Sequence, residues 1–170
     1  MKNIWILTTG GTIEKSYSED EGSLENRESL LQRKLIEKLR IPYTEVKVKT
    51  LMAKDSLHMT DEDREIIFQS IKESLGQCDG IVVLHGTDTL DKTLLYCYNQ
   101  LAKPSIPVVF TGAMKPAGFD DSDALQNFTE ALYASQVVTP GYYLSFHGHL
   151  FHGPNFKKNK LLRTFESSKD

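Results

Sequence analysis

Continuous apolar runs are the feature that most constrains the fold of this chain. They cover residues 4–7, 81–84 and 106–110, each bounded by polar residues or glycine, and residues 142–146 can form a further strand. A run of this length without alternation is typical of a strand that is covered on both faces. Residues 46–50 instead alternate apolar with charged side chains, which predicts a strand with one face in water, near the edge of a sheet.

Helical patterns separate these strand-like runs. Apolar residues at helical spacing predict helices over residues 28–39, 90–101 and 120–136, and Thr60 is the expected N-cap of a further helix that begins with acidic residues. The alternation of strands and helices predicts an α/β fold: a three-layer, flavodoxin-like, mostly parallel sheet with helices on both faces.

Length and composition limit the class of protein. The 170 residues are expected to form a single domain over residues 1–170, in which residues 157–170 are a polar and partly mobile tail. With 20 Lys and Arg against 23 Asp and Glu, nothing suggests a nucleic-acid partner. No stretch reaches the roughly 18 to 20 apolar residues of a membrane-spanning helix. The chain has no apparent secretory signal, and Cys78 and Cys97 are isolated thiols, so we expect a cytoplasmic protein without membrane contact.

Two turns place threonine hydroxyls directly after strand-like runs. They are Thr-Thr-Gly-Gly-Thr-Ile at residues 8–13 and His-Gly-Thr-Asp-Thr at residues 85–89. Because ligands of parallel sheets bind beyond the carboxyl ends of the strands, both turns fall on the expected binding edge. Taken singly, the first turn also fits a plain strand-to-loop turn or a phosphate-binding loop, and the second fits a helix N-cap. Together they favour a covalent hydrolase, since a threonine hydroxyl becomes a nucleophile beside a proton acceptor and glycine turns leave N–H groups for an oxyanion.

Other polar clusters have a structural explanation. His147 and His149 share one face of a predicted strand, but no further ligand accompanies them, so we expect no metal site. The aspartates between residues 120 and 123 are expected to cap a helix. His85 is expected to be a packed, hydrogen-bonded histidine that shapes its turn, with a role in the site as the alternative.

In combination the motifs resemble the bacterial-type L-asparaginases. The two threonine motifs at residues 9–13 and 85–89 are together highly specific to that family. Further agreement lies in Asp-Ser-x-x-Met at residues 55–59 and in Thr-Gly-Ala-Met-Lys-Pro at residues 111–116. The resemblance covers nearly the whole chain, but only the N-terminal domain of the usual two-domain protein. In length and motifs the chain is similar to a short-chain bacterial branch of the family that lacks the second domain.

This resemblance implies a catalytic set, which comprises Thr12, Tyr17, Thr87, Asp88 and Lys158. Thr12 would be the nucleophile that attacks the side-chain amide, and Tyr17 the lid tyrosine hydrogen-bonded to it. Thr87 would be the second threonine, paired with Lys158. Lys157 is the alternative to Lys158, because one residue of slippage exchanges the two lysines.

The resemblance also implies a substrate-binding set, which comprises Asp55, Ser56, Gly86, Thr87, Asp88 and Ala113. Ser56 would hold the α-carboxylate of the substrate, and Asp88 would receive its α-ammonium group. A backbone N–H of Thr87 or Ala113 would stabilise the oxyanion.

The function implied is hydrolysis of L-asparagine to L-aspartate and ammonia through a threonyl acyl-enzyme, without a cofactor, by a homo-oligomer (dimer or tetramer). One alternative is a non-catalytic amino-acid-binding or partner-binding domain derived from such an enzyme. Another is the amidase component of a tRNA-dependent amidotransferase, against which the acidic net charge argues. Asparagine and glutamine are not separated, because one methylene changes binding by only about 1–3 kcal/mol.

Overall fold

A computed structural model describes residues 1–14 and 35–168. Within these residues a six-stranded sheet has the strand order β2-β1-β3-β4-β5-β6. The strands are β1 (Lys2–Thr8), β2 (Thr44–Thr50), β3 (Gly80–Leu84), β4 (Pro107–Thr111), β5 (Gly141–Phe146) and β6 (His149–His152). All neighbours pair in parallel except β5 and β6, which are antiparallel. The order of the parallel strands is that of flavodoxin-like folds, and β2 lies at the edge, as its alternating pattern predicts.

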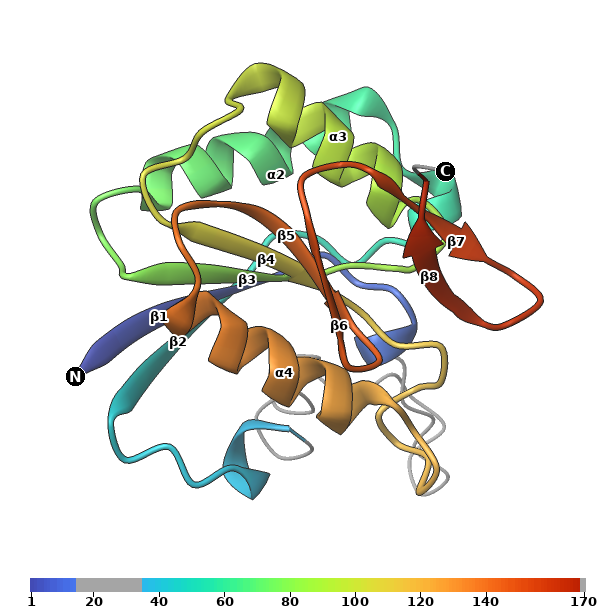
Figure 1. Ribbon diagram of the computed structural model, residues 1–170, viewed down its shortest axis with the longest axis horizontal. Coiled ribbons are helices and arrows are strands. Elements are labelled where there is room, and N and C mark those ends of the chain that lie inside the picture. Colours follow the sequence, from blue (N-terminus) through green and yellow to red (C-terminus); the bar gives the residue numbers. More distant parts are fainter. Residues whose placement is uncertain (15–34, 169–170) are drawn as a thin grey trace.

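Helices cover both faces of this sheet (Figure 1). The helices α2 (Asp61–Ser74) and α3 (Leu90–Gln100) lie on one face, and α4 (Ala124–Val137) lies on the other. Successive strand residues alternate between the two cores: Val83 packs toward α2 and α3, whereas Val82 packs toward α4. Burial of β3, β4 and β5 on both faces explains why their sequences are mostly apolar and carry no charge. The predicted α/β architecture is therefore confirmed.

Helix starts follow local capping chemistry only in part. Thr60 caps α2 as predicted, in a capping box with Asp63. The helix predicted over residues 120–136 begins later, at Ala124, and Asp123 precedes it without a side-chain capping bond. Asp123 occupies the N-cap position as predicted, but its carboxylate accepts the N–H groups of Met114 and Lys115 instead of one from the helix. The predicted helix at residues 28–39 falls mostly outside the described residues, and its end forms a short 3₁₀ turn, Ile36–Lys38.

The C-terminal segment differs from the polar tail expected at residues 157–170. Its described part contains the antiparallel strands β7 (Phe156–Asn159) and β8 (Thr164–Ser167). Phe156 and Phe165 of this hairpin are buried and belong to the same core cluster as Leu94 of α3. Two aromatic anchors separated by polar residues give no continuous apolar run, which is why the pattern did not indicate strands.

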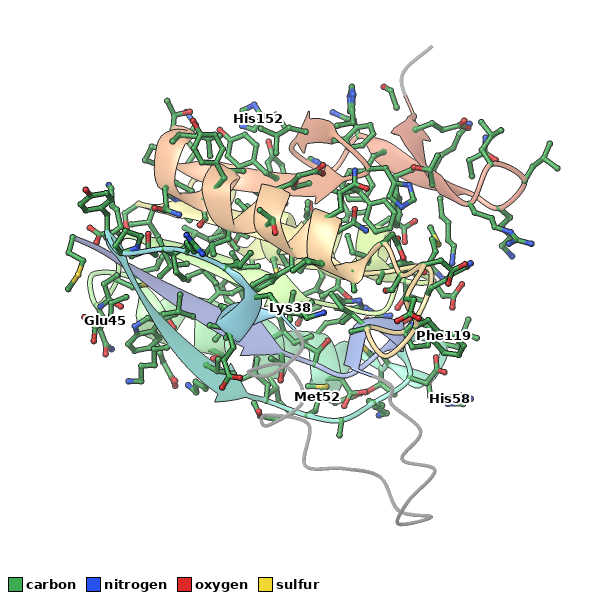
Figure 2. All side chains as sticks on the ribbon, turned by 90° about the horizontal axis from the view of Figure 1, so that it is seen from below. Lys38, Glu45, Met52, His58, Phe119 and His152 are labelled. Carbon is green, nitrogen blue, oxygen red and sulfur yellow. The ribbon has the colours of Figure 1, made fainter. Side chains whose placement is uncertain are left out.

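The carboxyl ends of the parallel strands lie at one end of the molecule. The β7–β8 hairpin is placed at this same end (Figure 1). Figure 2 shows His58 and Phe119, from the segments after β2 and β4, at the end opposite to Glu45 at the start of β2. Among the described helices, none is both long and apolar enough to cross a membrane.

Candidate active site

Glycines let the turns after β1, β3 and β4 pack directly against one another. A Cβ atom on Gly11 would lie 2.6 Å from the backbone N and Cα of Gly86. A Cβ atom on Gly112 would lie 2.3 Å from the carbonyl oxygen of His85. Neither position has room for a side chain, and Gly11 also has a φ of +89°, which other residues rarely adopt. The three turns are therefore in backbone contact.

Thr12 begins a short 3₁₀ helix, Thr12–Glu14, directly after the first turn. Thr9, on the strand side of this turn, is fully buried and donates from Oγ1 to the carbonyl of Leu84 over 2.9 Å. Thr12 is only partly buried, and its hydroxyl has no hydrogen bond to another described residue. Of the two threonines that flank the glycines, Thr9 is thus structural and Thr12 is available for chemistry.

Thr87, in the second turn, is buried and paired with a lysine from the C-terminal hairpin. Lys158 Nζ donates to Thr87 Oγ1 over 2.7 Å and to Asp88 Oδ1 over 2.8 Å. The Lys158 side chain is 18% exposed, against 38% for Asp88, so the ammonium is the more enclosed partner. An amine in contact with a buried hydroxyl and a carboxylate is an arrangement through which a proton can be exchanged.

The two neighbouring lysines of β7 have opposite surroundings. Because side chains alternate along a strand, Lys158 faces Thr87 while Lys157 faces outward. Lys157 forms an ion pair with Glu166 of β8 at 3.5 Å, and its side chain is 57% exposed. Of the two candidates left open by the sequence, Lys158 is the one that contacts Thr87.

Ser56 lies against the second turn from the side of β2. A Cβ atom on Gly86 would lie 2.5 Å from Ser56 Oγ, so glycine at this position lets the serine approach the backbone. Thr89 fixes Ser56 by donating from Oγ1 to its carbonyl over 2.8 Å, and both residues are buried. The Asp55 carboxylate accepts the N–H of Leu57 over 3.0 Å. The structure thus places Ser56 beside Gly86, with Asp55 directly before it in the chain.

The turn after β4 is held by residues that sequence analysis missed. Asn127 of α4 is fully buried and donates from Nδ2 to the carbonyl of Gly112 over 3.0 Å, directly before Ala113. Its Oδ1 accepts the N–H of His147, also over 3.0 Å. A usable signal was present, because Asn127 is a polar residue on the apolar stripe of α4.

Asp123 joins this network beside Asn127. Its Oδ2 lies 2.8 Å from Nε2 of His147 and 3.0 Å from Nδ2 of Asn127. Burial raises the pKa of Asp123. The hydrogen bonds from the backbone N–H groups of Met114 and Lys115 and from His147 lower it by a larger amount, so the pKa is below its ordinary value. Asp123 is therefore an ionised anchor for the segment after Ala113.

His85 is a packed, hydrogen-bonded histidine, as predicted. It is fully buried, with Nδ1 2.7 Å from the carbonyl of Gly86 and Nε2 2.8 Å from Oγ1 of Thr93. Burial lowers the pKa of His85 to about 4, with a smaller contribution from the charge of Arg64. The imidazole is accordingly neutral near pH 7.

Tyr17, the predicted lid residue, lies outside the described residues. His147 and His149 do not form a metal centre: His147 bonds to Asp123 and Thr164. Within residues 1–14 and 35–168, no cluster of three or more His, Cys, Asp or Glu side chains could hold a metal ion.

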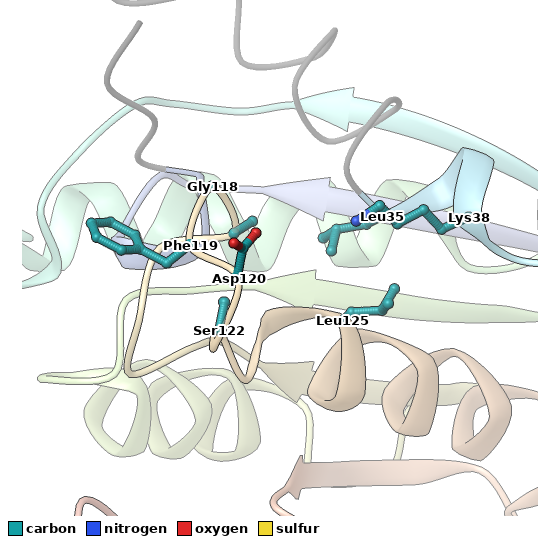
Figure 3. Close-up of a pocket in the computed structure, with 8 residues that line it drawn as sticks. Leu35, Lys38, Gly118, Phe119, Asp120, Ser122 and Leu125 are labelled. Carbon is teal, nitrogen blue, oxygen red and sulfur yellow. The ribbon is translucent and has the colours of Figure 1, made fainter. Parts of the chain in front are cut away.

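A pocket of about 170 Å³ lies beside the segment that follows Ala113 (Figure 3). Leu35 and Leu125 supply apolar walls, while Lys38 and Asp120 bring opposite charges to it. Neither Thr12 nor Thr87 lines this pocket, which is therefore separate from the threonine turns.

Comparisons with known proteins agree with this arrangement. A family model described as asparaginase, N-terminal, matches residues 3–169. The L-asparaginase of Thermococcus kodakarensis is 32% identical over 154 residues, which cover 90% of this chain and 46% of that protein. The structure of the thermostable L-asparaginase from the same organism superposes with a TM-score of 0.88 at 31% identity, covering 97% of this chain and 51% of that one.

A second kind of relative also matches. The matching component of the glutamyl-tRNA(Gln) amidotransferase from Methanococcus vannielii is 28% identical over 88% of this chain and 35% of that protein. The chain thus spans about half, or less, of the length of the relatives it matches. Because the family model matches nearly the whole of this chain, the chain belongs to the asparaginase family and corresponds to its N-terminal domain.

Proposed function

We propose that this chain hydrolyses a side-chain amide, with L-asparagine as substrate and L-aspartate and ammonia as products. The observation that carries the proposal is the hydrogen bond from Lys158 to Thr87, on a turn in backbone contact with the turn before Thr12. Two hydroxyls and an amine at one edge of a sheet are the groups that a covalent amide hydrolysis requires. Membership of the asparaginase family supports the same reaction.

In the proposed reaction Thr12 Oγ1 attacks the amide carbon of the substrate. The hydroxyl proton passes to the amino group, which leaves as ammonia, and an ester to Thr12 remains. Water hydrolyses this ester, releasing aspartate and restoring the hydroxyl. Thr87 and Lys158 provide the proton path, and the backbone N–H groups of Thr87 and Ala113 stabilise the oxyanion.

The substrate is proposed to be held by its α-groups. Asp88 has one carboxylate oxygen on Lys158 and is 38% exposed, so it can also accept an α-ammonium group. Ser56, packed against Gly86, is proposed to bind the α-carboxylate, and Asp55 is proposed to belong to the same substrate-binding set. Tyr17 is the proposed lid residue that hydrogen-bonds Thr12. No cofactor takes part in these steps.

Ammonia release from L-asparagine tests the nucleophile. Thr12→Ala should lower kcat by at least about 10³-fold, whereas Thr12→Ser, which keeps a hydroxyl, should retain measurable turnover. Activity that survives Thr12→Ala at the wild-type level excludes the threonyl ester. If wild-type protein binds L-aspartate in a calorimeter but releases no ammonia, the alternative of a non-catalytic binding domain replaces hydrolysis.

Similarity to an amidotransferase component favours a second candidate, in which the chain supplies ammonia within a tRNA-dependent amidotransferase. The same assay with L-glutamine separates the two candidates. A kcat/KM for glutamine more than tenfold above that for asparagine would favour the amidotransferase role, because a pocket separates substrates that differ by one methylene by about 10–200-fold.

We further propose a cytoplasmic homo-oligomer, either a dimer or a tetramer. Leu161 and Leu162, at the tip of the hairpin that carries Lys158, are 90% and 68% exposed. Large apolar side chains exposed beside a site favour a covering surface from another copy. Light scattering on the eluting protein should give a mass of two or four chains, and a monomer at micromolar concentration would contradict the proposal.

A further inference from the structure

Two peptide groups that follow the carboxyl ends of β3 and β4 have carbonyls that are hydrogen-bonded by buried side chains. Nδ1 of His85 lies 2.7 Å from the carbonyl oxygen of Gly86, and Nδ2 of Asn127 lies 3.0 Å from that of Gly112. Both side chains are fully buried. Each therefore fixes the plane of one peptide group from the interior of the protein.

Because a peptide group is planar, fixing the direction of its carbonyl also fixes the direction of its N–H group. In a trans peptide the C=O and N–H groups point in opposite directions, and no described peptide is cis. With the carbonyls of Gly86 and Gly112 turned toward His85 and Asn127, the N–H groups of the following residues are turned away from these side chains. The following residues are Thr87 and Ala113, the two residues whose N–H groups are proposed to bind the oxyanion.

Neither of these N–H groups donates to another described residue. Their turns are also adjacent: a Cβ atom on Gly112 would lie 3.4 Å from Cγ2 of Thr87. Buried backbone donors are nearly always paired, so two neighbouring N–H groups without an acceptor at a binding edge indicate a place for an oxygen of a ligand.

The orientation of the His85 ring is fixed on both sides. A carbonyl oxygen can only accept, so Nδ1 must carry the proton that points to Gly86. Nε2 is then an acceptor and receives the hydroxyl of Thr93 over 2.8 Å. Burial keeps this neutral tautomer, because the pKa of His85 is lowered to about 4.

The orientation of the Asn127 amide is fixed in the same manner. Its Oδ1 accepts the N–H of His147, which requires that the Nδ2 end faces the carbonyl of Gly112. The same Nδ2 also donates to the Asp123 carboxylate over 3.0 Å. All the hydrogen-bonding groups of this amide are thereby used in one orientation.

We propose that His85 and Asn127 are positioning residues that aim the N–H groups of Thr87 and Ala113 at the oxygen of the amide being cleaved. The proposal rests on the amide hydrolysis proposed above. It assigns the two residues no contact with substrate: they act through the peptide groups that they hold. Removing one oxyanion donor from an acyl-transfer site lowers kcat by about 10²–10³-fold, and this is the upper limit expected for the loss of one positioning side chain.

A matched pair of variants at His85 tests the proposal. Asparagine places an N–H near the position of Nδ1, whereas glutamine places one near that of Nε2. His85→Asn therefore keeps the bond to Gly86 and loses the bond to Thr93, and His85→Gln does the opposite. We expect His85→Asn to keep kcat within about threefold of wild type and His85→Gln to lose about tenfold to 100-fold, with KM changed less than threefold in both. Equal losses of kcat in the two variants would overturn the proposal, because a residue that only stabilises the fold would not distinguish them.

Crystal structures of the same variants give a readout that does not depend on activity. In His85→Gln the Gly86–Thr87 peptide should rotate, since its carbonyl has lost its donor and glycine permits the change. In His85→Asn it should stay as in the wild type. An unrotated peptide in His85→Gln overturns the positioning role even if the wild type is an active asparaginase. If the wild type releases no ammonia, the hydrolytic function fails, and the rotation still decides whether His85 holds this peptide.

Discussion

The turn after β1 and the turn after β3 have similar sequences but different surroundings. Thr12 is partly exposed, and no described residue receives or donates a hydrogen bond at its hydroxyl. Thr87 is 4% exposed and receives the ammonium of Lys158, and the carbonyl before it is held by His85. This difference fits the roles proposed above, in which the Thr12 hydroxyl attacks the substrate and the Thr87 hydroxyl takes part in proton transfer.

This difference follows from what supports each turn. The turn after β1 is shaped by its own glycines and by the neighbouring backbone of Gly86 and Lys54. The turn after β3 is supported from three elements: α3 through Thr93, the segment before α2 through Ser56, and the β7–β8 hairpin through Lys158. Variants that remove one of these contacts at a time should therefore differ in their effects on turnover and on the free energy of unfolding, according to which turn they affect.

The largest expected effect comes from the lysine that holds Thr87. Lys158→Met removes the ammonium but keeps a side chain of similar length, so it should lower kcat by about 10²–10⁴-fold, the usual range for loss of a proton-transfer group. Lys157→Met is the matched control and should leave kcat within about twofold, because its ion pair with Glu166 is exposed. The check is steady-state ammonia release by the two variants, and equal effects would remove Lys158 from the proton path.

The next effect tests the contact between the two turns. Gly11→Ala puts a Cβ atom 2.6 Å from the backbone of Gly86, which cannot move aside as a side chain would, at a φ of +89°. We expect it to lower the free energy of unfolding by roughly 3 kcal/mol or more. Gly76→Ala is the control, since its φ of +80° imposes a similar strain with no atom within 4 Å, and it should cost about 1 kcal/mol. Urea unfolding curves measure both, and a difference under about 1 kcal/mol would mean that the turns are not in tight contact.

The fold was predictable because its strands are buried on both faces. The runs at residues 81–84 and 106–110 have no charged residue, and the alternation at residues 46–50 indicated the edge strand. The β7–β8 hairpin was not predictable, since its anchors Phe156 and Phe165 lie far apart in a polar stretch. A hairpin of this kind is stabilised by long-range packing, which a local pattern does not reveal.

The candidate site was predictable to the level of its motifs. The turns with Thr12 and Thr87 could be placed at one end of the sheet because each follows a predicted parallel strand. The choice between Lys157 and Lys158 required the register of β7, and one residue of register reverses which side chain faces the site. Asn127 and Asp123 act on the site through hydrogen bonds across the fold, so spacing along the chain could not identify their partners.

The pH dependence of the free energy of unfolding should reveal the burial of His85, which holds the carbonyl before Thr87. The pKa of His85 is about 4 in the folded protein, below its ordinary value of 6.5, so between these pH values the unfolded chain binds more protons than the folded one. Stability therefore rises with pH through this window and is lost as the pH falls from about 6.5 toward 4, by at most roughly 3 kcal/mol from this residue. His85→Gln should show a shallower loss in urea titrations over the same range. Carboxylates such as Asp123 titrate in both proteins and cancel in the difference, so equal slopes would contradict a buried neutral His85.

The smallest expected effect concerns the tie between Ser56 and the turn after β3. Thr89→Val keeps the volume but removes the hydroxyl that donates to the Ser56 carbonyl over 2.8 Å, which should cost about 1 kcal/mol of stability. Because Ser56 is proposed to bind the α-carboxylate, a looser Ser56 should raise KM for asparagine a few-fold while kcat changes little, since Thr12 and Thr87 keep their own supports. Thr89→Ser restores the donor and should restore KM. A change confined to kcat would place Thr89 with the supports of Thr87, and would show that the two turns are less independent than their different surroundings indicate.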